Sequence, residues 1–180
     1  MKFTINRDLL LDALNNVSRG LSAKTPMPVL TGIKIEVSNN CITLITTNRE
    51  ISVRVVLDNV SDVNNFEDGV CVVPGKYFID IIKKLEGKDV EFTLFDANTI
   101  KIISDRSTFT LISLDYTNFP NINFDVKSEV ININSLKLKN FIKQTAFAAG
   151  INETRLVLTG VCLETKQKDL QMIATDSYRL

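Results

Sequence analysis

The sequence predicts an α+β fold with antiparallel sheets, two helices per domain and repeated domains. Many short segments rich in Val, Ile and Thr are separated by turn residues, which is typical of strands. A few segments instead carry apolar residues at helical spacing. Strands mixed with a few helices favour antiparallel sheets. A stretch of sequence also recurs further along the chain, which indicates a repeated unit.

The chain opens with an alternating strand at 2–6, followed by a helix over 7–21. The apolar residues of this helix fall on one face: Leu10, Leu14, Val17 and Leu21. The next strands are predicted at 29–37, 41–47, 51–57 and 70–73. Asn39-Asn40 is a plausible hairpin turn between the first two of these strands.

A second helix is predicted over 76–85, burying Phe78, Ile81, Ile82 and Leu85. A meander of three strands follows at 89–95, 98–104 and 107–113. The polar stretch from Asp115 to Lys127 contains a proline and is expected to be a linker. The last elements are a strand at 129–133, a helix at about 135–149, and strands at 156–164 and 169–175.

The repeat is the most informative feature of the sequence. Val29-Leu30-Thr31-Gly32 recurs as Val157-Leu158-Thr159-Gly160, 128 positions later. The same register, without a gap, aligns Ile5-Asn6 with Ile133-Asn134, Leu10 with Leu138, Glu36 with Glu164, Ile45 with Ile173 and Thr47 with Thr175. Both copies have the order strand, helix, strand, strand. We therefore expect a complete domain at 1–125 and the first part of a second copy at 126–180, truncated at Leu180.

Composition excludes several classes of function. The hydrophobic fraction of 44% supports a folded core, and the net charge of +0 means that any nucleic-acid role must rest on local charge. Histidine is absent, which removes His-based triads and most zinc sites. Cys41, Cys71 and Cys162 are expected to be small buried residues in strands rather than metal ligands or disulfides.

An enzyme is the main alternative to a binding protein. Candidate acids such as Asp115, Glu153 and Asp176 exist, as in any chain. However, the sequence has no Gly-rich phosphate loop, HExxH, GxSxG or metal-spaced carboxylate cluster. We therefore expect no catalytic residue, metal or cofactor. With no long apolar stretch and no signal-peptide pattern, a cytoplasmic location is the default expectation.

Several segments together resemble the bacterial DNA sliding clamp, the β subunit of DNA polymerase III. They are MKFTINRDLL, TPMPVLTGIKIEV, VPGKYFIDIIKKL, YTNFPN and ETRLVLTGV with ATDSYRL. The resemblance covers the whole chain, in order, and implies the DNA-clamp fold. Members of that family have three such domains and dimerise head to tail into a ring around duplex DNA. This chain matches the first domain and about half of the second, and the third is absent.

The resemblance implies a non-catalytic processivity factor of the replicative DNA polymerase. Its expected partners are double-stranded DNA, bound without sequence preference, the replicative polymerase catalytic subunit, the clamp loader and other proteins with clamp-binding motifs. A full-length chain would form a head-to-tail homodimer. A non-catalytic β-rich ligand- or peptide-binding module remains an alternative, which the repeat and the lysines described next disfavour only weakly.

Candidate DNA-binding residues lie in three places. The helix at about 135–149 carries Lys137, Lys139 and Lys143 and no acidic residue, with its apolar residues on the other side. An ordinary solvated face would explain this helix alone, whereas the resemblance implies that it lines the bore. By the same resemblance, Lys24, Lys76 and Asn152 match positions that contact DNA. A surface lysine without a function is an equal alternative for the first two.

The resemblance also implies a pocket for partner peptides and a ring interface. The pocket residues would be Leu158, Thr175, Ser177, Tyr178, Arg179 and Leu180. Aliphatic walls would provide burial, and the arginine would fix orientation. Taken alone, Leu158 is more typical of a core residue. The interface residues would be Phe109 and Leu111, at a sheet edge, and Ile81, on the second helix.

Overall fold

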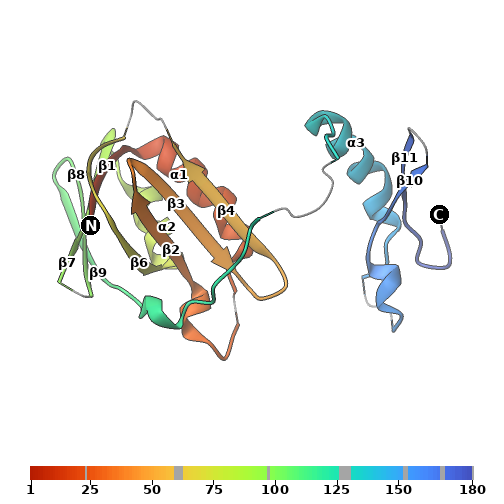
Figure 1. The fold of residues 1–180 in the computed structure, drawn as a ribbon, viewed down its shortest axis with the longest axis horizontal. Helices are drawn as coiled ribbons and strands as arrows, with labels where there is room; N and C mark the ends of the chain where they lie inside the picture. Colours follow the sequence, from red (N-terminus) through yellow and green to blue (C-terminus); the bar gives the residue numbers. More distant parts are fainter. Residues whose placement is uncertain are drawn as a thin grey trace. The chain divides into compact units, whose positions relative to one another are not determined.

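The computed structural model describes residues 1–22, 24–58, 63–96, 98–125, 131–151, 154–166 and 169–179. Two units are separate in it: Met1–Asn123, called unit 1, and Phe124–Leu180, called unit 2 (Figure 1). Within the described residues, no helix is long and apolar enough to cross a membrane.

Unit 1 contains two antiparallel sheets. The larger has the order β5-β1-β7-β8-β9. Its strands are β1 (Lys2–Asn6), β5 (Val63–Glu67), β7 (Asp89–Phe95), β8 (Thr99–Ser104) and β9 (Ser107–Ile112). The smaller has the order β4-β3-β2-β6. Its strands are β2 (Gly32–Ser38), β3 (Cys41–Thr47), β4 (Ser52–Leu57) and β6 (Gly69–Pro74). The outermost strands of the sheets are therefore β5, β9, β4 and β6, and Leu114 pairs with Val72 of β6.

Two helices pack together on the smaller sheet. They are α1 (Arg7–Val17), which contacts β3 and β4, and α2 (Gly75–Lys84), which contacts β2 and β6. The Asn6 side chain caps α1, because its oxygen accepts hydrogen bonds from the backbone N–H groups of Asp8 at 3.0 Å and Leu9 at 3.2 Å. The apolar face of α1 is buried as its spacing predicts.

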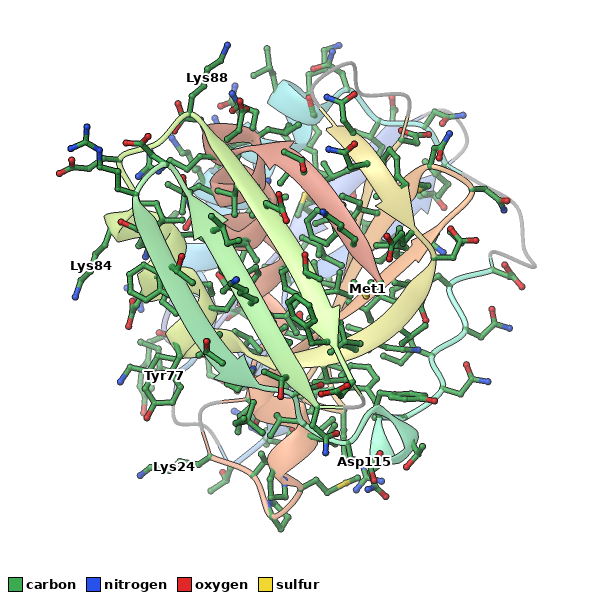
Figure 2. The ribbon with its side chains drawn as sticks, turned by 90° about the vertical axis from the view of Figure 1, so that its left-hand side faces the viewer. Met1, Lys24, Tyr77, Lys84, Lys88 and Asp115 are labelled. Atoms are coloured by element: carbon green, nitrogen blue, oxygen red, sulfur yellow. The ribbon has the colours of Figure 1, made fainter. Side chains whose placement is uncertain are left out.

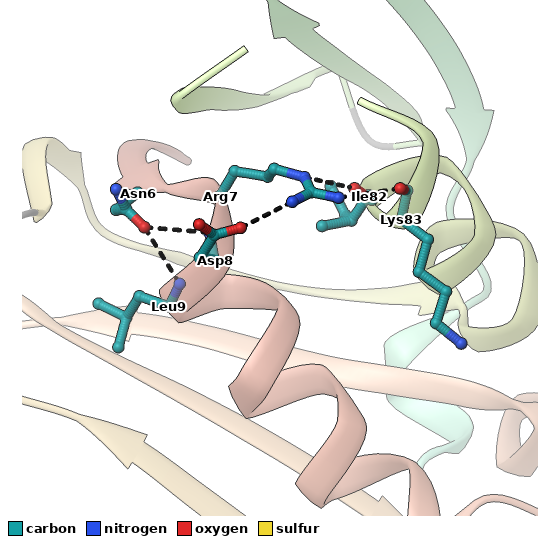
Figure 3. Close-up of polar contacts among 6 residues, drawn as sticks. All are labelled: Asn6, Arg7, Asp8, Leu9, Ile82 and Lys83. Atoms are coloured by element: carbon teal, nitrogen blue, oxygen red, sulfur yellow. Dashed lines mark hydrogen bonds and ion pairs between the residues drawn. The ribbon is translucent and has the colours of Figure 1, made fainter. Parts of the chain in front are cut away.

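Arg7 ties the start of α1 to the end of α2 (Figure 3). Its guanidinium donates to the carbonyl oxygens of Ile82 at 3.2 Å and Lys83 at 2.9 Å, and to the Asp8 carboxylate at 2.6 Å. Carbonyls in the last turn of a helix have no partner within the helix, so this arginine satisfies two of them. The contact holds the two helices in register.

The core of unit 1 lies between the two sheets and the helices. Phe3 of β1 stacks on Phe92 of β7 with ring centroids 4.8 Å apart, and Phe78 of α2 meets Phe92 edge to face at 5.9 Å. Such aromatic pairs contribute about 0.5–1.5 kcal/mol beyond their burial. These three residues are fully buried, so one aromatic cluster joins the larger sheet to α2.

Unit 2 repeats the first half of unit 1 at the predicted offset of 128. Its elements are α3 (Ser135–Thr145), 3₁₀ helices at Ala146–Ala148 and Leu156–Thr159, β10 (Cys162–Lys166) and β11 (Asp169–Ile173). Their counterparts in unit 1 are α1, the 3₁₀ helices at Ser18–Gly20 and Pro28–Thr31, β2 and β3. From the first helix onward, the order of elements is the same, which confirms the repeat.

Four features differ from the prediction. The stretches predicted as strands from 29 and from 156 begin with 3₁₀ helices. In each, a threonine hydroxyl donates to the carbonyl three residues earlier at 2.8 Å, from Thr31 to Pro28 and from Thr159 to Leu156. Residues 131–133, predicted within a strand, form none; β1, their counterpart, needs β5 and β7 as partners. The predicted helix over 7–21 ends at Val17 and continues as a 3₁₀ helix. Strand β5 was not predicted.

Two side-chain predictions are also wrong. Ile79, not Ile81, lies on the buried face of α2, and Ile81 is only partly buried. The linker predicted from Asp115 packs against unit 1 at its start, since Phe119 is buried and Lys34 lies 5.7 Å from its ring centroid. The polar composition of this stretch therefore gave no indication that Phe119 anchors it to unit 1.

Candidate functional site

The three predicted lysines lie exposed on α3. Lys137, Lys139 and Lys143 share an eleven-residue helix that contains no acidic residue, and none is ion-paired with another described residue. The side chain of Asn134 caps the helix through the N–H groups of Leu136 at 3.1 Å and Lys137 at 3.2 Å, as Asn6 caps α1. The capping residue therefore sets where the helix begins and which way these lysines point.

The placement of these lysines is electrostatically unfavourable for an isolated helix. Lys137 lies in the first turn, where the helix dipole disfavours positive charge by a few tenths of a kcal/mol or more. Lys139 and Lys143 are four residues apart, so two like charges face each other on the same side. An anionic partner at this face would relieve both costs.

The other predicted DNA-binding residues are in the loop regions and at α2. Lys24 is exposed in the loop before the Pro28–Thr31 turn, and Lys76 is exposed at the second position of α2. Figure 2 shows Lys24 at one end of unit 1. Asn152 lies outside the described residues.

Part of the predicted peptide pocket is present in unit 2. Leu158 and Thr175 line a mainly apolar hollow of about 350 Å³, together with residues 157, 160–162, 173 and 174. Ser177, Tyr178 and Arg179 do not line this hollow; they form the exposed turn that follows Thr175. Leu180 lies outside the described residues. Two of the six predicted residues therefore line the hollow, and three more form the turn beside Thr175.

The turn after Thr175 is built by side-chain hydrogen bonds. Thr175 Oγ1 accepts from the Ser177 N–H at 3.0 Å, and Asp176 Oδ1 accepts from the N–H groups of Tyr178 at 3.0 Å and Arg179 at 3.1 Å. Unit 1 has the same turn at Thr47, Asn48 and Arg49, with matching bonds of 3.0, 3.0 and 2.7 Å. Ser177 and Arg49 both adopt positive φ, 74° and 77°.

The hollow is closed in unit 1. A Cβ on Gly32 would lie 2.4 Å from Val72 Cγ1 on β6 and 3.0 Å from Leu114 Cδ1. A Cβ on Gly160, the counterpart, meets no atom nearer than the Val157 carbonyl oxygen at 4.0 Å. The space that β6 and Leu114 fill beside β2 is therefore open beside β10.

Two of the three predicted ring-interface residues lie on the edge strand β9, and the third, Ile81, lies on α2. Phe109 and Leu111 lie opposite the buried residues Ile102 and Ile100 of β8, so they extend the core face to the edge of the sheet. Phe109 is 38% exposed, whereas Leu111 and Ile81 are partly buried against the core. An unpaired edge with apolar side chains is suited to pairing with another surface.

Titratable groups give no indication of acid–base chemistry. Hydrogen bonds from Thr117 hold the pKa of the exposed Asp115 carboxyl below its ordinary value, and the Tyr178 N–H does the same for Asp176, with smaller contributions from Arg179. Burial raises the pKa of the Cys71 thiol to about 12. Cys162 is exposed, contrary to the sequence-based expectation. Among the described residues, no group of three or more His, Cys, Asp or Glu side chains is arranged to hold a metal ion.

Sequence reasoning missed Arg155. Its guanidinium donates to Ser177 Oγ at 2.6 Å, which links the residue that precedes the Leu156–Thr159 helix to the turn after Thr175. The repeat offers no signal for this contact, because Met27 and Arg49 occupy the equivalent positions.

Solved structures with the same fold are DNA polymerase sliding clamps. The clamp from Bacillus subtilis superposes with a TM-score of 0.92 at 33% identity, covering 98% of this chain and 48% of that one. The DNA polymerase III β chain from Streptococcus pneumoniae gives 0.91 at 33% identity, with the same coverage. The fold is therefore that of a sliding clamp.

Sequence comparison identifies the family. The model of the DNA polymerase III beta subunit N-terminal domain matches residues 1–123, and that of the central domain matches residues 132–180. A beta sliding clamp from Staphylococcus aureus (strain Mu50) is 39% identical over 184 residues, covering 100% of this chain and 49% of the relative. The chain belongs to the DNA polymerase III beta subunit family, and it spans about half the length of the curated relatives it matches. That family is a non-catalytic processivity factor of DNA polymerase III.

Proposed function

We propose that this chain supplies the first domain, residues 1–125, and the first part of the second domain, residues 126–180, of a sliding clamp that encircles duplex DNA. In this role it raises the processivity of the replicative polymerase and performs no chemistry. The proposed role depends on ring closure and on charge, because a closed ring must attract phosphates without recognising particular bases.

The lysine face of α3 carries the proposal. Lys137, Lys139 and Lys143 are exposed and are not ion-paired with described residues; the helix dipole disfavours Lys137, and mutual repulsion disfavours the pair Lys139 and Lys143. Contacts from lysine to phosphate are independent of sequence, as sliding requires. Lys24 and Lys76 of unit 1 and Asn152 of unit 2 are assigned the same role.

Two further surfaces complete the proposed role. Leu158, Thr175 and the turn with Ser177, Tyr178 and Arg179, together with Leu180, form one wall of a pocket for the polymerase catalytic subunit, the clamp loader and other proteins with clamp-binding motifs. The hollow beside Leu158 and the arginine on the adjacent turn support this assignment. Phe109 and Leu111 at the β9 edge and Ile81 on α2 are assigned to the head-to-tail dimer contact of a full-length chain. The first two support this, because they extend the core face to that edge.

The DNA proposal is tested by salt titration. Binding of a fluorescent 30-base-pair duplex of arbitrary sequence is measured between about 20 and 200 mM salt, where log K falls by about 0.9 per log unit of salt for each phosphate neutralised. Replacing Lys137, Lys139 and Lys143 with Gln should flatten this slope by up to about 2.7.

A matched triple variant controls for net charge. Lys88→Gln, Lys101→Gln and Arg106→Gln remove the same charge from β8 and from the loops beside β7 and β8. This variant should keep a steeper slope than the α3 variant. Equal slopes for the two would mean that α3 does not face DNA, and a dependence on duplex sequence would contradict the clamp role.

A further inference from the structure

Unit 1 has an apolar pocket that the proposed clamp role does not use. It has a volume of about 340 Å³, within the range of small-ligand sites. Residues 26–29 form one wall, and Leu114, Asp115 and Asn118 form the other. The two walls come from segments more than 80 residues apart in sequence, so only the fold brings them together.

Both walls are held in place by hydrogen bonds. On the first, the Met27 N–H donates to Thr25 Oγ1 at 3.1 Å and the Leu30 N–H donates to the Met27 carbonyl at 3.0 Å. On the second, the Leu114 N–H donates to the Val72 carbonyl at 2.8 Å. Prolines at 26 and 28 stiffen the first wall further. A pocket formed in advance loses little conformational entropy on binding.

The chemistry of the pocket indicates its ligand. Val29 is buried at the base, while Met27 and Leu114 are partly exposed. Asp115 is the one charged side chain that lines it, and it has no ion pair with another described residue. Lys24 lies at the same end of unit 1 but away from Asp115 (Figure 2). An apolar pocket with a carboxylate at its mouth complements an aliphatic side chain next to a cation.

We propose that this pocket docks an extended segment of another protein, with an aliphatic side chain in the pocket and a neighbouring lysine or arginine at Asp115. The interaction is separate from DNA binding and from the pocket proposed at Leu158. The repeat places residues 26–29 where residues 154–157 stand in unit 2, beside Leu158. Of the residues that line the hollow at Leu158, Val157 alone has its counterpart, Val29, in the lining of this pocket, so the two hollows differ in position.

The three methionines of the chain provide a direct test. Met27 lines the pocket, Met1 packs against the core and Met172 lies on β11 of unit 2. The chain is labelled with ¹³C at the methionine methyl groups and titrated with the peptide acetyl-Gly-Ser-Leu-Lys-Ser-Gly-amide. The Met27 signal should shift saturably, with a Kd of about 1 mM, and the other two should not. The same peptide with Glu in place of Lys should bind more weakly.

Two aspartate variants separate charge recognition from fold. Asp115→Asn removes the charge and retains an oxygen that can accept from Thr117, but its amide nitrogen cannot accept from Asn118 Nδ2 as Asp115 Oδ2 does at 2.9 Å. The variant should lower affinity for the lysine peptide about 2–5-fold, as for an exposed ion pair. Asp105→Asn, in the turn between β8 and β9, changes net charge equally and should have no effect.

Several results would overturn the proposal. These are an unshifted Met27 signal at about 10 mM peptide, equal shifts of all three methyl groups, or an unchanged preference for lysine over glutamate in Asp115→Asn. A Met27 signal that moves on dilution of the chain without peptide would show that a second copy of this chain occupies the pocket. That result would also overturn the proposal.

Discussion

The helices α1 and α3 are the same element in two different surroundings. Each has eleven residues, an asparagine cap that binds two N–H groups, and a three-residue 3₁₀ extension. Yet Leu14 of α1 is fully buried, whereas Ile142, its counterpart in α3, is 44% exposed. Capping and periodicity act within about one turn of the helix, whereas burial needs β4 and α2, which come from later in the chain.

The outward faces of the two helices also differ. Asp8 and Asp12 of α1 correspond to Leu136 and Asn140 of α3, and the lysines of α3 correspond to Leu9, Leu11 and Asn15. The backbone is repeated while the surface is not. Two of the three α3 lysines therefore stand where α1 has leucines, Leu9 and Leu11, that pack partly against the core.

The largest expected difference between the units lies in their apolar faces. Leu14→Ala should destabilise unit 1 by about 2–5 kcal/mol, because it leaves a cavity in a closed core. Ile142→Ala should cost under about 1 kcal/mol in unit 2, since much of that side chain is already in water. Urea unfolding followed by amide NMR signals from each unit measures both. Equal losses would show that the α3 face is as well covered as that of α1.

Equivalent glycines give the next largest contrast. Gly32→Ala would place Cβ 2.4 Å from Val72 and 2.9 Å from the Val73 carbonyl, so it should destabilise unit 1 by about 1–3 kcal/mol. Gly160→Ala meets open space and should change stability by less than about 0.5 kcal/mol. Neither glycine has positive φ, so backbone strain does not confuse the comparison. Thermal unfolding of each variant measures the effect. Similar shifts in the unfolding temperature of both variants would contradict the open hollow beside β10.

Loss of a helix cap should cost the two units the same free energy of unfolding. Asn6→Ala and Asn134→Ala each delete hydrogen bonds to two N–H groups, and each should cost about 1 kcal/mol. Hydrogen exchange at the first turn of α1 and α3 measures the loss locally. Asn6→Asp and Asn134→Asp serve as controls that retain a capping oxygen. A loss confined to unit 1 would mean that the cap of α3 contributes little without tertiary packing.

The smallest effect is a pH response that only one unit should show. Hydrogen bonds from the Tyr178 N–H and from Arg179 hold the pKa of Asp176 below its ordinary value of 3.8. The carboxylate therefore stabilises the turn at pH above that value, and this contribution is lost as pH falls through the lowered pKa. Amide shifts of Tyr178 and Arg179 should follow the protonation of Asp176 in acid, whereas the hydrogen bond from the Ile51 N–H to Asn48 should persist, because Asn48 does not titrate. Asp176→Asn should abolish the response, and a response that persists in it would reject this assignment.

Prediction from sequence succeeded where the signal is local. The repeat located α3 and both strands of unit 2, because capping residues and periodicity recur with it. Prediction failed at residues 29–31 and 157–159. Val, Leu and Thr favour a strand there, but these residues belong to 3₁₀ helices that begin one residue earlier. β5 was missed because its segment, VNNFE, has no alternating apolar pattern; it is a strand because β1 offers a partner.

The candidate sites divide in the same way. The exposure of Lys137, Lys139 and Lys143 follows from helical periodicity alone. The hydrogen bond from Arg155 to Ser177 joins residues 22 positions apart, and the pocket between residues 26–29 and Leu114 joins segments still further apart. No local pattern encodes those distances.

Helix starts, turns and the repeat are therefore properties of the sequence, because a cap, a proline or an apolar stripe acts on its near neighbours. The tertiary structure decided which apolar faces are buried, which sheet edges stay unpaired and which glycine must remain glycine. Val72 and Leu114 exclude a Cβ at Gly32, and no described residue does so at Gly160. The physical reason is that packing requires a second surface, which a segment of chain cannot supply for itself.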